Sequence, residues 1–427
     1  MLARVENDLL TQTNSGTGAG EYFRRFWLPA LLPSEVPTPD CPPVRIRLLG
    51  EDLIAFRDTD GRVGLMDEFC PHRRASLFWG RNEECGLRCV YHGWKFDVTG
   101  ACLDMPNEPP EYRFNNKIRA AAYPTREYGG SIWAYLGPPD KTPELPKLEL
   151  ARVPDSHRYT SKRLQESNYL QAVEGGIDSS HSNFLHTTVE AFRVTDSYVA
   201  KIKNSANLRA KYHLLDKAPR FTVKETDYGL MIVNRRNAEE DTYYWRVTPF
   251  LLPSYTIIPS QKGISLSGHC WVPRDDETCW VWTFTWNPNG PLTQDDCDAI
   301  ANETYVHAKV DPATLRPLRN KDNNYGIDRE LQRTTTMTGI HGFASQDQAL
   351  QESMGEVDRT REHLGTSDTA IIGTRRLLLR EIKALQQGVE PRAAHLGDAY
   401  WVHSCSVVLK REVELDEGVR ELMTAAV

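Results

Sequence analysis

The chain has 427 residues, 40% of them hydrophobic and 26% charged, which is typical of a globular protein with two or more domains. The formal net charge is −7 and there is no basic tract, so we expect no nucleic-acid partner. No apolar run reaches eighteen residues, and the N-terminus lacks the apolar centre of a secretory signal, so we expect no membrane association. The nine cysteines, an odd number, do not suggest a disulfide framework, so we expect a cytoplasmic protein.

The first part of the chain predicts a small all-β domain. Alternating residues predict strands at 44–48 and 53–57, and the returning strand covers 63–69. Asp58-Thr-Asp-Gly61 predicts a hairpin turn, because Asp-Gly readily adopts the positive φ that such a turn needs. The segment 138–146 is rich in proline and charge and predicts a linker, so we divide the chain into domains 1–140 and 141–427.

The second domain has a mixed pattern. We expect residues 164–190 to be helical and residues 208–288 to form a sheet of β-branched and aromatic strands. Helices are expected at 293–310 and 348–388. Arg209 is expected early in the sheet, and Arg235-Arg236 in a turn. These elements predict an α+β fold, with an antiparallel sheet and helices on one face.

Two short segments form the first metal-binding motif. Cys70-Pro-His72 and Cys89-Val-Tyr-His92 have the pattern C-x-H followed by C-x2-H. Two thiolates and two imidazoles suit a [2Fe–2S] cluster with cysteines on one iron and histidines on the other, which raises the reduction potential above that of an all-cysteine cluster. The alternative is a structural zinc site, for which this spacing is unusual.

A second constellation follows about ninety residues downstream. In Glu174-x3-Asp178-x2-His181-x4-His186, the first three residues would share one face of a helix, and a bulge or helix end is needed before His186. Iron(II) that binds O2 beside a substrate is typically held by two histidines and one carboxylate. The alternative is a polar helix with two incidental histidines. The spacing alone does not select the carboxylate.

These motifs resemble those of the Rieske non-haem iron aromatic-ring-hydroxylating oxygenases. The resemblance rests on Cys-Pro-His-Arg, on Cys-Val-Tyr-His-Gly-Trp-Lys-Phe-Asp and on the motif from Glu174 to His186. It extends to the phthalate dioxygenase branch through residues 23–29 and the Gln-Glu-Ser-Met-Gly segment. It implies an all-β Rieske [2Fe-2S] domain followed by a helix-grip-like catalytic domain. Arg74 stands where many relatives have glycine.

The resemblance also implies roles for individual residues. His181 and His186 would bind a mononuclear Fe(II), and Asp347 in Ser345-Gln-Asp347 would be the third ligand, with Glu352, Asp358 and Asp368 as alternatives. Asp178 would bridge His92 of one subunit and His181 of the next. Such head-to-tail contacts close into rings, so the resemblance implies a homotrimer or stacked trimers.

Together the two sites predict a terminal oxygenase that uses O2 and electrons from a separate NAD(P)H-dependent reductase. The glycine-rich stretch 16–20 follows no predicted strand and is interpreted as a loop rather than a dinucleotide site. We expect cis-dihydroxylation of an aromatic carboxylate such as phthalate, with Arg209 and Arg246 as substrate-binding candidates. Arg246 lies between two apolar residues, where an unpaired guanidinium would be costly. The alternatives are O- or N-demethylation and, more remotely, a non-catalytic electron carrier, which would not need the second domain.

Overall fold

The computed structural model describes residues 2–203, 205–213 and 215–425. The chain divides into two compact units, each described by itself. The small unit contains residues 12–144 and 272–276. The large unit contains the residues up to Thr11, residues 145–271 and the chain from residue 277 onward. Helix α1 (Arg4–Thr11) belongs to the large unit because it packs against α3 and α9 of that unit.

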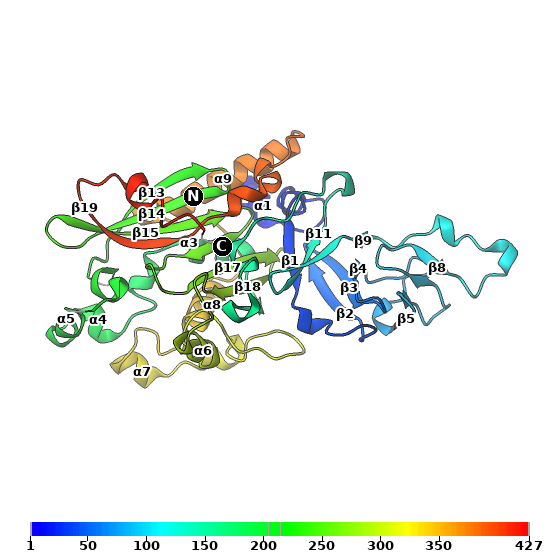
Figure 1. Cartoon of the computed structure of the whole chain (residues 1–427), viewed down its shortest axis with the longest axis horizontal. Helices are drawn as coiled ribbons and strands as arrows, with labels where there is room; N and C mark the ends of the chain where they lie inside the picture. Colours follow the sequence, from blue (N-terminus) through cyan, green and yellow to red (C-terminus); the bar gives the residue numbers. More distant parts are fainter. Residues whose placement is uncertain (1, 204, 214, 426–427) are drawn as a thin grey trace. The chain divides into compact units, whose positions relative to one another are not determined.

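The small unit is built from short antiparallel strands (Figure 1, blue to cyan). Its sheets have the strand orders β1-β11-β10, β2-β3-β4-β9 and β5-β6-β7-β8. The strands are β1 (Trp27–Leu31), β2 (Val44–Leu48), β3 (Glu51–Arg57), β4 (Val63–Asp67), β5 (Arg81–Glu83), β6 (Gly86–Arg88), β7 (Lys95–Phe96), β8 (Cys102–Asp104), β9 (Ala122–Tyr123), β10 (Thr125–Tyr128) and β11 (Ser131–Tyr135). Helix α2 (Gly18–Phe23) precedes them.

Strands β2, β3 and β4 occupy the segments in which the sequence predicts them. Gly61 has a φ of 81° in the predicted hairpin turn, and its amide donates to the Asp58 carbonyl. The core of this unit contains Ile54, Phe56 and Phe96, together with the two cysteines of the first motif. The apolar packing therefore reaches the bases of both metal-binding loops.

The large unit is organised around one long antiparallel sheet with the order β12-β18-β17-β16-β15-β14-β13, and β19 pairs with β15. The strands are β12 (Arg158–Gln165), β13 (Arg220–Thr226), β14 (Gly229–Asn237), β15 (Thr242–Leu251), β16 (Tyr255–Ile258), β17 (Leu266–Pro273), β18 (Cys279–Trp286) and β19 (Cys405–Lys410). Every residue of β18 is buried, because this strand carries aromatic and branched side chains on both faces.

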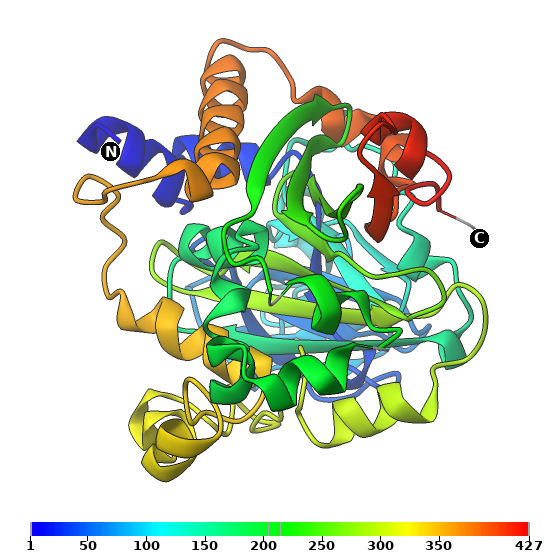
Figure 2. The same ribbon diagram turned by 90° about the vertical axis from the view of Figure 1, so that its left-hand side faces the viewer.

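Helices cover parts of this sheet. They are α3 (Tyr169–Ile177), α4 (Val189–Arg193), α5 (Asp196–Ile202), α6 (Gln294–Ala301), α7 (Arg329–Thr334), α8 (Phe343–Ser353), α9 (Thr369–Gln386) and α10 (Leu415–Val419). Helix α3 packs against β16 and α8, while α9 packs against β13 and β14. Figure 2 shows α9 (orange) beside the green strands, with α6 and α7 (olive to yellow) at the opposite end of this unit.

The two-part fold and the mixed second domain agree with the predicted fold class, but several local predictions were wrong. Arg235 and Arg236 lie in β14 instead of a turn, because Arg236 is buried and donates to Asn183 and Asn234. Arg209 lies in a π-helical turn (Arg209–His213) and not in the sheet.

Predicted helix lengths were also wrong. The helix expected at 293–310 covers only Gln294–Ala301. The helix expected at 348–388 is two helices, because Gly355, with a φ of 68°, turns the chain after α8. Helix α3 ends before His181, at Asp178, whose carboxylate accepts from the amides of Ser180 (2.6 Å) and His181 (3.3 Å). These side-chain hydrogen bonds replace helical ones, so the helix does not continue past Asp178.

Candidate functional site

The two cysteine-histidine segments form loops of the same construction. In the first, the Cys70 amide donates to the Ala75 carbonyl and the Arg74 amide donates to the Cys70 carbonyl, both at 2.9 Å. In the second, the Cys89 amide donates to the Trp94 carbonyl at 2.8 Å and the Gly93 amide donates to the Cys89 carbonyl at 2.9 Å. Each loop therefore holds its cysteine at the base and carries its histidine toward the tip.

The structure brings these four side chains together. The Cys70 side chain is buried, and its hydrogen bond with Cys89 lowers the pKa of Cys89 to about 6, while the same bond and burial raise the pKa of Cys70. The rings of His72 and His92 lie 4.4 Å apart between centroids. Burial, and then the charge of His92, lower the pKa of His72, which favours the neutral imidazole that a metal needs. Two inner thiols and two outer imidazoles match the ligand set of a Rieske [2Fe–2S] cluster.

Neighbouring residues support the loops. Trp94 stacks on the His72 ring at 4.4 Å with an interplanar angle of 10°. Gly93 has a φ of 82°, and a Cβ there would lie 2.4 Å from Pro106 Cγ, so a larger residue does not fit. Arg74 occupies the equivalent position of the first loop with a φ of 61°, a conformation that glycine adopts more easily. Its guanidinium contacts the Asp67 carboxylate.

The second constellation forms a compact triangle of donor atoms in the large unit. His181 Nε2 lies 3.2 Å from His186 Nε2 and 3.5 Å from Asp347 Oδ1, and His186 Nε2 lies 3.2 Å from Asp347 Oδ1. Metal–ligand bonds of about 2.1 Å at right angles would place such donors roughly 3 Å apart. Two histidines and one carboxylate on one side of a metal form the facial triad of non-haem iron(II) oxygenases. The residues therefore fit a mononuclear iron.

Asp178 lies on the outer side of this triangle. Its Oδ2 is 3.5 Å from His181 Nδ1, so it faces the ring nitrogen that points away from His186. Burial opposes charge on His181, but the hydrogen bond to Asp178, the charge of Asp347 and the charge of Asp178 outweigh it and raise the pKa of His181. Burial likewise opposes charge on Asp178 and Asp347, but nearby histidines lower both carboxyl pKa values.

The other carboxylates considered from the sequence have different partners. Glu352 Oε1 accepts from the Glu166 amide at 2.8 Å, and its other oxygen accepts from the Tyr325 hydroxyl. Asp358 accepts from Thr360, and Asp368 accepts from the Gly365 amide. Among the described residues, only Asp347 joins His181 and His186 in a cluster of donor atoms.

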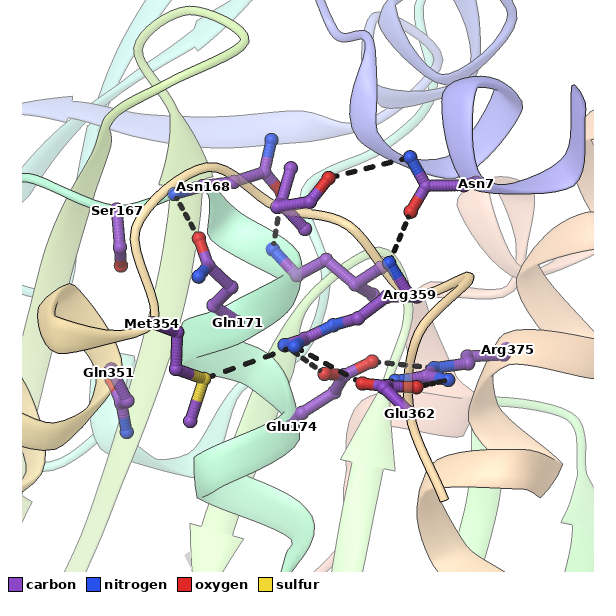
Figure 3. Close-up of polar contacts among 12 residues, drawn as sticks. Asn7, Ser167, Asn168, Gln171, Glu174, Gln351, Met354, Arg359, Glu362 and Arg375 are labelled. Carbon is purple, nitrogen blue, oxygen red and sulfur yellow. Dashed lines mark hydrogen bonds and ion pairs between the residues drawn. The ribbon is translucent and has the colours of Figure 1, made fainter. Parts of the chain in front are cut away.

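Glu174, the first residue of the motif, belongs to a buried ion network (Figure 3). Its carboxylate pairs with Arg359 Nη2 at 2.5 Å and with Arg375 Nε at 2.6 Å. Glu362 pairs with the same two arginines, at 3.1 Å and 2.6 Å. The Asn7 carboxamide accepts from the Arg359 amide on the far side. The network joins α3, α9 and the loop that follows α8. It lies behind the segment that carries His181 and His186.

A cavity of about 130 Å³ contains the histidine–carboxylate triangle. A second, outer cavity of about 280 Å³ lies beside it. The residues that line both cavities, here called the neck, are Arg209, Arg246, Ile258, Pro259 and Tyr305. The outer cavity reaches Ile264, which is exposed at the surface. Trp271 and Phe343 contribute apolar surface to the inner cavity.

Both arginines that the sequence suggested for substrate binding thus line the cavity that contains the triangle. Arg246 is only 7% exposed and its Nε has no hydrogen-bond partner. Arg209 lies over the Phe343 ring at 5.2 Å from its centroid. Among the described residues neither guanidinium pairs with a carboxylate. Burial, and then the positive charge of Arg246, lower the pKa of Arg209.

Sequence reasoning missed other cavity residues. Arg163 on β12 is buried, donates to Thr283 Oγ1 at 2.8 Å and has its pKa lowered to about 10 by burial. His269 on β17 stacks on Trp271, and burial lowers its pKa to about 3, so it is neutral. Arg163 lies in a strand of mostly polar residues and gives no signal in the sequence. His269 precedes Cys270-Trp-Val272 in β17, and a polar residue beside this apolar run is the only signal that would have drawn attention to it.

Comparison with known proteins identifies the family. A Rieske [2Fe-2S] domain model matches residues 26–124, and a model described as LigXa C-terminal domain like matches residues 134–410. The chain belongs to the Rieske oxygenases. This Rieske oxygenase is 40% identical to the phthalate 4,5-dioxygenase oxygenase subunit of Pseudomonas putida, over 91% of this chain and 88% of the relative.

Two further relatives have different reactions in their names. The 3-chlorobenzoate-3,4-dioxygenase oxygenase subunit of Comamonas testosteroni is 37% identical, over 94% of each chain. The 5,5'-dehydrodivanillate O-demethylase oxygenase subunit of a Sphingobium species is 32% identical, over 92% of this chain and 83% of the relative. The structure of dicamba monooxygenase bound to dicamba has a TM-score of 0.57 and 18% identity, covering 86% of this chain and 99% of that one, which shows a shared fold.

This membership establishes the general chemistry. The chain is an oxidoreductase, the terminal oxygenase component of a Rieske system, and its cofactors are a [2Fe-2S] Rieske cluster and a mononuclear iron. The cluster supplies single electrons, and the mononuclear iron activates O2. Within the part of the chain that the structure describes, no helix is long and apolar enough to cross a membrane.

Proposed function

We propose that this Rieske oxygenase hydroxylates an aromatic carboxylate such as phthalate, by cis-dihydroxylation. The aromatic ring lies in the inner cavity, and its carboxylate binds Arg209 and Arg246 at the neck. The observation that carries the proposal is a pair of guanidinium groups, buried at Arg246 and half-buried at Arg209. Neither has a carboxylate partner among the described residues, and both line the same cavity as His181, His186 and Asp347.

Electrostatics supports this choice of substrate. A buried cation without a partner is unfavourable, so an anionic ligand interacts more favourably with the arginines at this neck than it would with a cation in water. A carboxylate matches the planar guanidinium in a bidentate contact. Apolar surface from Trp271 and Phe343 suits the ring. The relatives named for phthalate and 3-chlorobenzoate also act on aromatic acids.

Each residue of the site has one task in this proposal. His181, His186 and Asp347 hold the iron, which supplies the O2 chemistry when it is bound. The Asp178 carboxylate faces His181 Nδ1 at 3.5 Å, which favours a proton on Nδ1 and keeps Nε2 free for the metal. Cys70, His72, Cys89 and His92 hold the cluster. The two arginines orient the ring and so determine which carbon faces the iron.

The proposal also includes assembly and electron supply. Asp178 of one subunit accepts a hydrogen bond from His92 of the next, and this head-to-tail contact closes a homotrimer or a stack of trimers. A separate NAD(P)H-dependent reductase supplies the electrons. A structural neighbour of 19% identity is a carbazole-bound oxygenase in complex with the ferredoxin of carbazole 1,9a-dioxygenase, which supports a separate protein partner. Nine cysteines without a disulfide among the described residues are consistent with a cytoplasmic location.

Demethylation is the second candidate, because a relative of 32% identity is named an O-demethylase. The same iron site serves both reactions, and they differ in which substrate atom lies nearest to the iron. The electron-carrier alternative does not account for the triangle of metal ligands or the neck arginines.

The test is a product assay with reductase, NADH and O2 over phthalate, substituted benzoates and methoxy- or N-methyl-arenes. We expect a diol from an aromatic acid. The Arg246→Gln variant should lose about 10- to 100-fold in kcat/KM, because a charge-assisted hydrogen bond contributes roughly 1.5–3 kcal/mol. Arg235→Gln is the matched control, since Arg235 stacks on Tyr243 and does not line the cavity. Exclusive formation of demethylated products, or equal loss in both variants, would contradict the proposal.

A further inference from the structure

The two histidines of the triangle are supported differently at the ring nitrogen that points away from the metal position. His181 Nδ1 faces the carboxylate of Asp178, a charged acceptor. His186 Nδ1 lies 2.7 Å from Oε1 of Gln346, a neutral group. Gln346 precedes Asp347 on α8 and is buried.

The orientation of the Gln346 carboxamide follows from its second contact. Its Nε2 donates to the Ile340 carbonyl at 2.8 Å, and a carbonyl only accepts. Therefore Oε1 is the atom that faces His186, and it must accept the proton of Nδ1. A flipped amide would place two oxygens against each other at Ile340 and lose that hydrogen bond, and its NH2 would require the His186 tautomer in which Nε2 carries the proton and cannot bind a metal.

A third contact fixes the plane of the same ring. Phe343 stacks on His186 with 4.3 Å between centroids and an interplanar angle of 19°. Phe343, Gln346 and Asp347 stand at positions i, i+3 and i+4 of α8, so they share one helix face. One helix thus provides a metal ligand and two contacts that orient a second ligand.

We propose that Gln346 is a positioning residue, which holds His186 as the Nδ1–H tautomer with Nε2 free to bind iron. This inference rests on the proposed role of His186 as a ligand. Because the acceptor is neutral, His186 donates less electron density to the metal than His181, whose acceptor is a carboxylate. The two histidines are therefore unequal ligands, although the sequence motif gives no sign of the difference.

The test measures Fe(II) affinity by chelator competition on the full protein with its cluster intact and its mononuclear iron removed. Gln346→Leu should bind Fe(II) about 10-fold more weakly, a typical effect of losing such a contact. Gln348→Leu is the matched control: Gln348 is also buried on α8, but it donates to Glu352 and does not reach the triangle. The control should change affinity by less than about twofold.

Gln346→Glu separates positioning from simple structural support. Glutamate keeps the oxygen that accepts from His186 Nδ1 but loses the amide that donates to Ile340. We expect the free energy of unfolding to fall in both Gln346 variants, while Fe(II) affinity falls only in the leucine variant. Equal Fe(II) affinity in Gln346→Leu and Gln348→Leu, or an affinity that follows stability in all variants, would overturn the inference.

His186→Ala distinguishes this outcome from failure of the proposed function. If His186→Ala retains wild-type Fe(II) affinity, the proposed metal site itself is wrong. If His186→Ala loses Fe(II) and Gln346→Leu does not, the site stands and only the role of Gln346 is wrong.

Discussion

The two metal-binding regions of this Rieske oxygenase are built in opposite ways. The loops proposed to hold the cluster place all four candidate ligands between residues 70 and 92, and each loop is closed by the same pair of backbone hydrogen bonds. The proposed mononuclear site combines His181 and His186 with Asp347, which comes from a separate helix much later in the chain. The first site depends on local turn geometry, whereas the second depends on how the large unit packs.

The largest effect is expected from a substitution that breaks the packing behind the mononuclear site. Glu174→Ala would leave Arg359 and Arg375 buried with only Glu362 to balance them. We expect the large unit to lose about 3–5 kcal/mol in free energy of unfolding, the usual cost of breaking a buried ion pair. Denaturant unfolding followed by tryptophan fluorescence would measure it.

The cluster loops should not respond to that change, so the visible absorption of the cluster should be retained. Glu225→Gln is the control, because Glu225 forms an exposed pair with Arg380 and should change stability by less than about 1 kcal/mol. Equal destabilisation by the two substitutions would show that the network of Figure 3 does not support the large unit.

The next test removes one distant ligand. Asp347→Asn should lower turnover by more than about 100-fold, because even residues behind a metal ligand cost 10- to 100-fold when they are changed. The Rieske absorption should not change. Asp358→Asn, which alters a carboxylate bonded to Thr360, serves as the control. Activity that falls more in the Asp358 variant than in the Asp347 variant would assign the third ligand elsewhere.

Acid should also affect the large unit through its buried histidines. The ring nitrogens of His307 form hydrogen bonds with the hydroxyl groups of Ser161 and Thr285. Burial is the main cause that lowers the pKa of His307 to about 3, and the charges of His269 and Arg163 lower it further. The unfolded chain takes up the proton near pH 6.5 and the folded chain does not, so this group's contribution to stability is complete above 6.5 and falls toward pH 3.

The expected loss from His307 is about 1.4 kcal/mol per pH unit between pH 6.5 and pH 3. His307→Gln removes the titrating group. The slope of the free energy of unfolding against pH should therefore decrease by that amount. A variant with the wild-type slope would mean that His307 is protonated in the folded protein.

The smallest test concerns the first cluster loop. Arg74→Gly should stabilise the small unit by about 1 kcal/mol, because Arg74 has a φ of 61° and glycine adopts it without the Cβ penalty. Thermal loss of the cluster absorption would measure the change. Arg73→Gly is the control: Arg73 does not have a positive φ, so glycine there should not stabilise. Stabilisation by both substitutions would exclude backbone strain at Arg74 as the reason.

The same contrast explains what could be predicted from the sequence. Strands β2 to β4 and the spacing from Cys70 to His92 are local patterns, and the structure has them where the sequence predicts. Asp347 could be suggested only through family resemblance, since nothing in the spacing of acidic residues selects one that α8 brings to the histidines.

Other parts of the site follow from packing and have no clear sequence signal. The π-helical turn carries Arg209 to the neck of the cavity, although the sequence placed it in the sheet. Arg236 was expected in a turn because it stands beside Asn237, but it lies inside β14, where its guanidinium donates to Asn183 and Asn234. Gln346 looks like any helical glutamine until its contact with His186 is seen.

The proposed function places an aromatic carboxylate, held by the neck arginines, next to the mononuclear iron. The most direct measurement is the EPR spectrum of the iron-loaded protein with nitric oxide as a probe, recorded with and without saturating phthalate, in wild type and in Arg246→Gln. We expect phthalate to change the wild-type spectrum at concentrations that leave the variant unchanged. A wild-type spectrum that no aromatic carboxylate alters, or one that phthalate alters equally in Arg246→Gln, would contradict the claim.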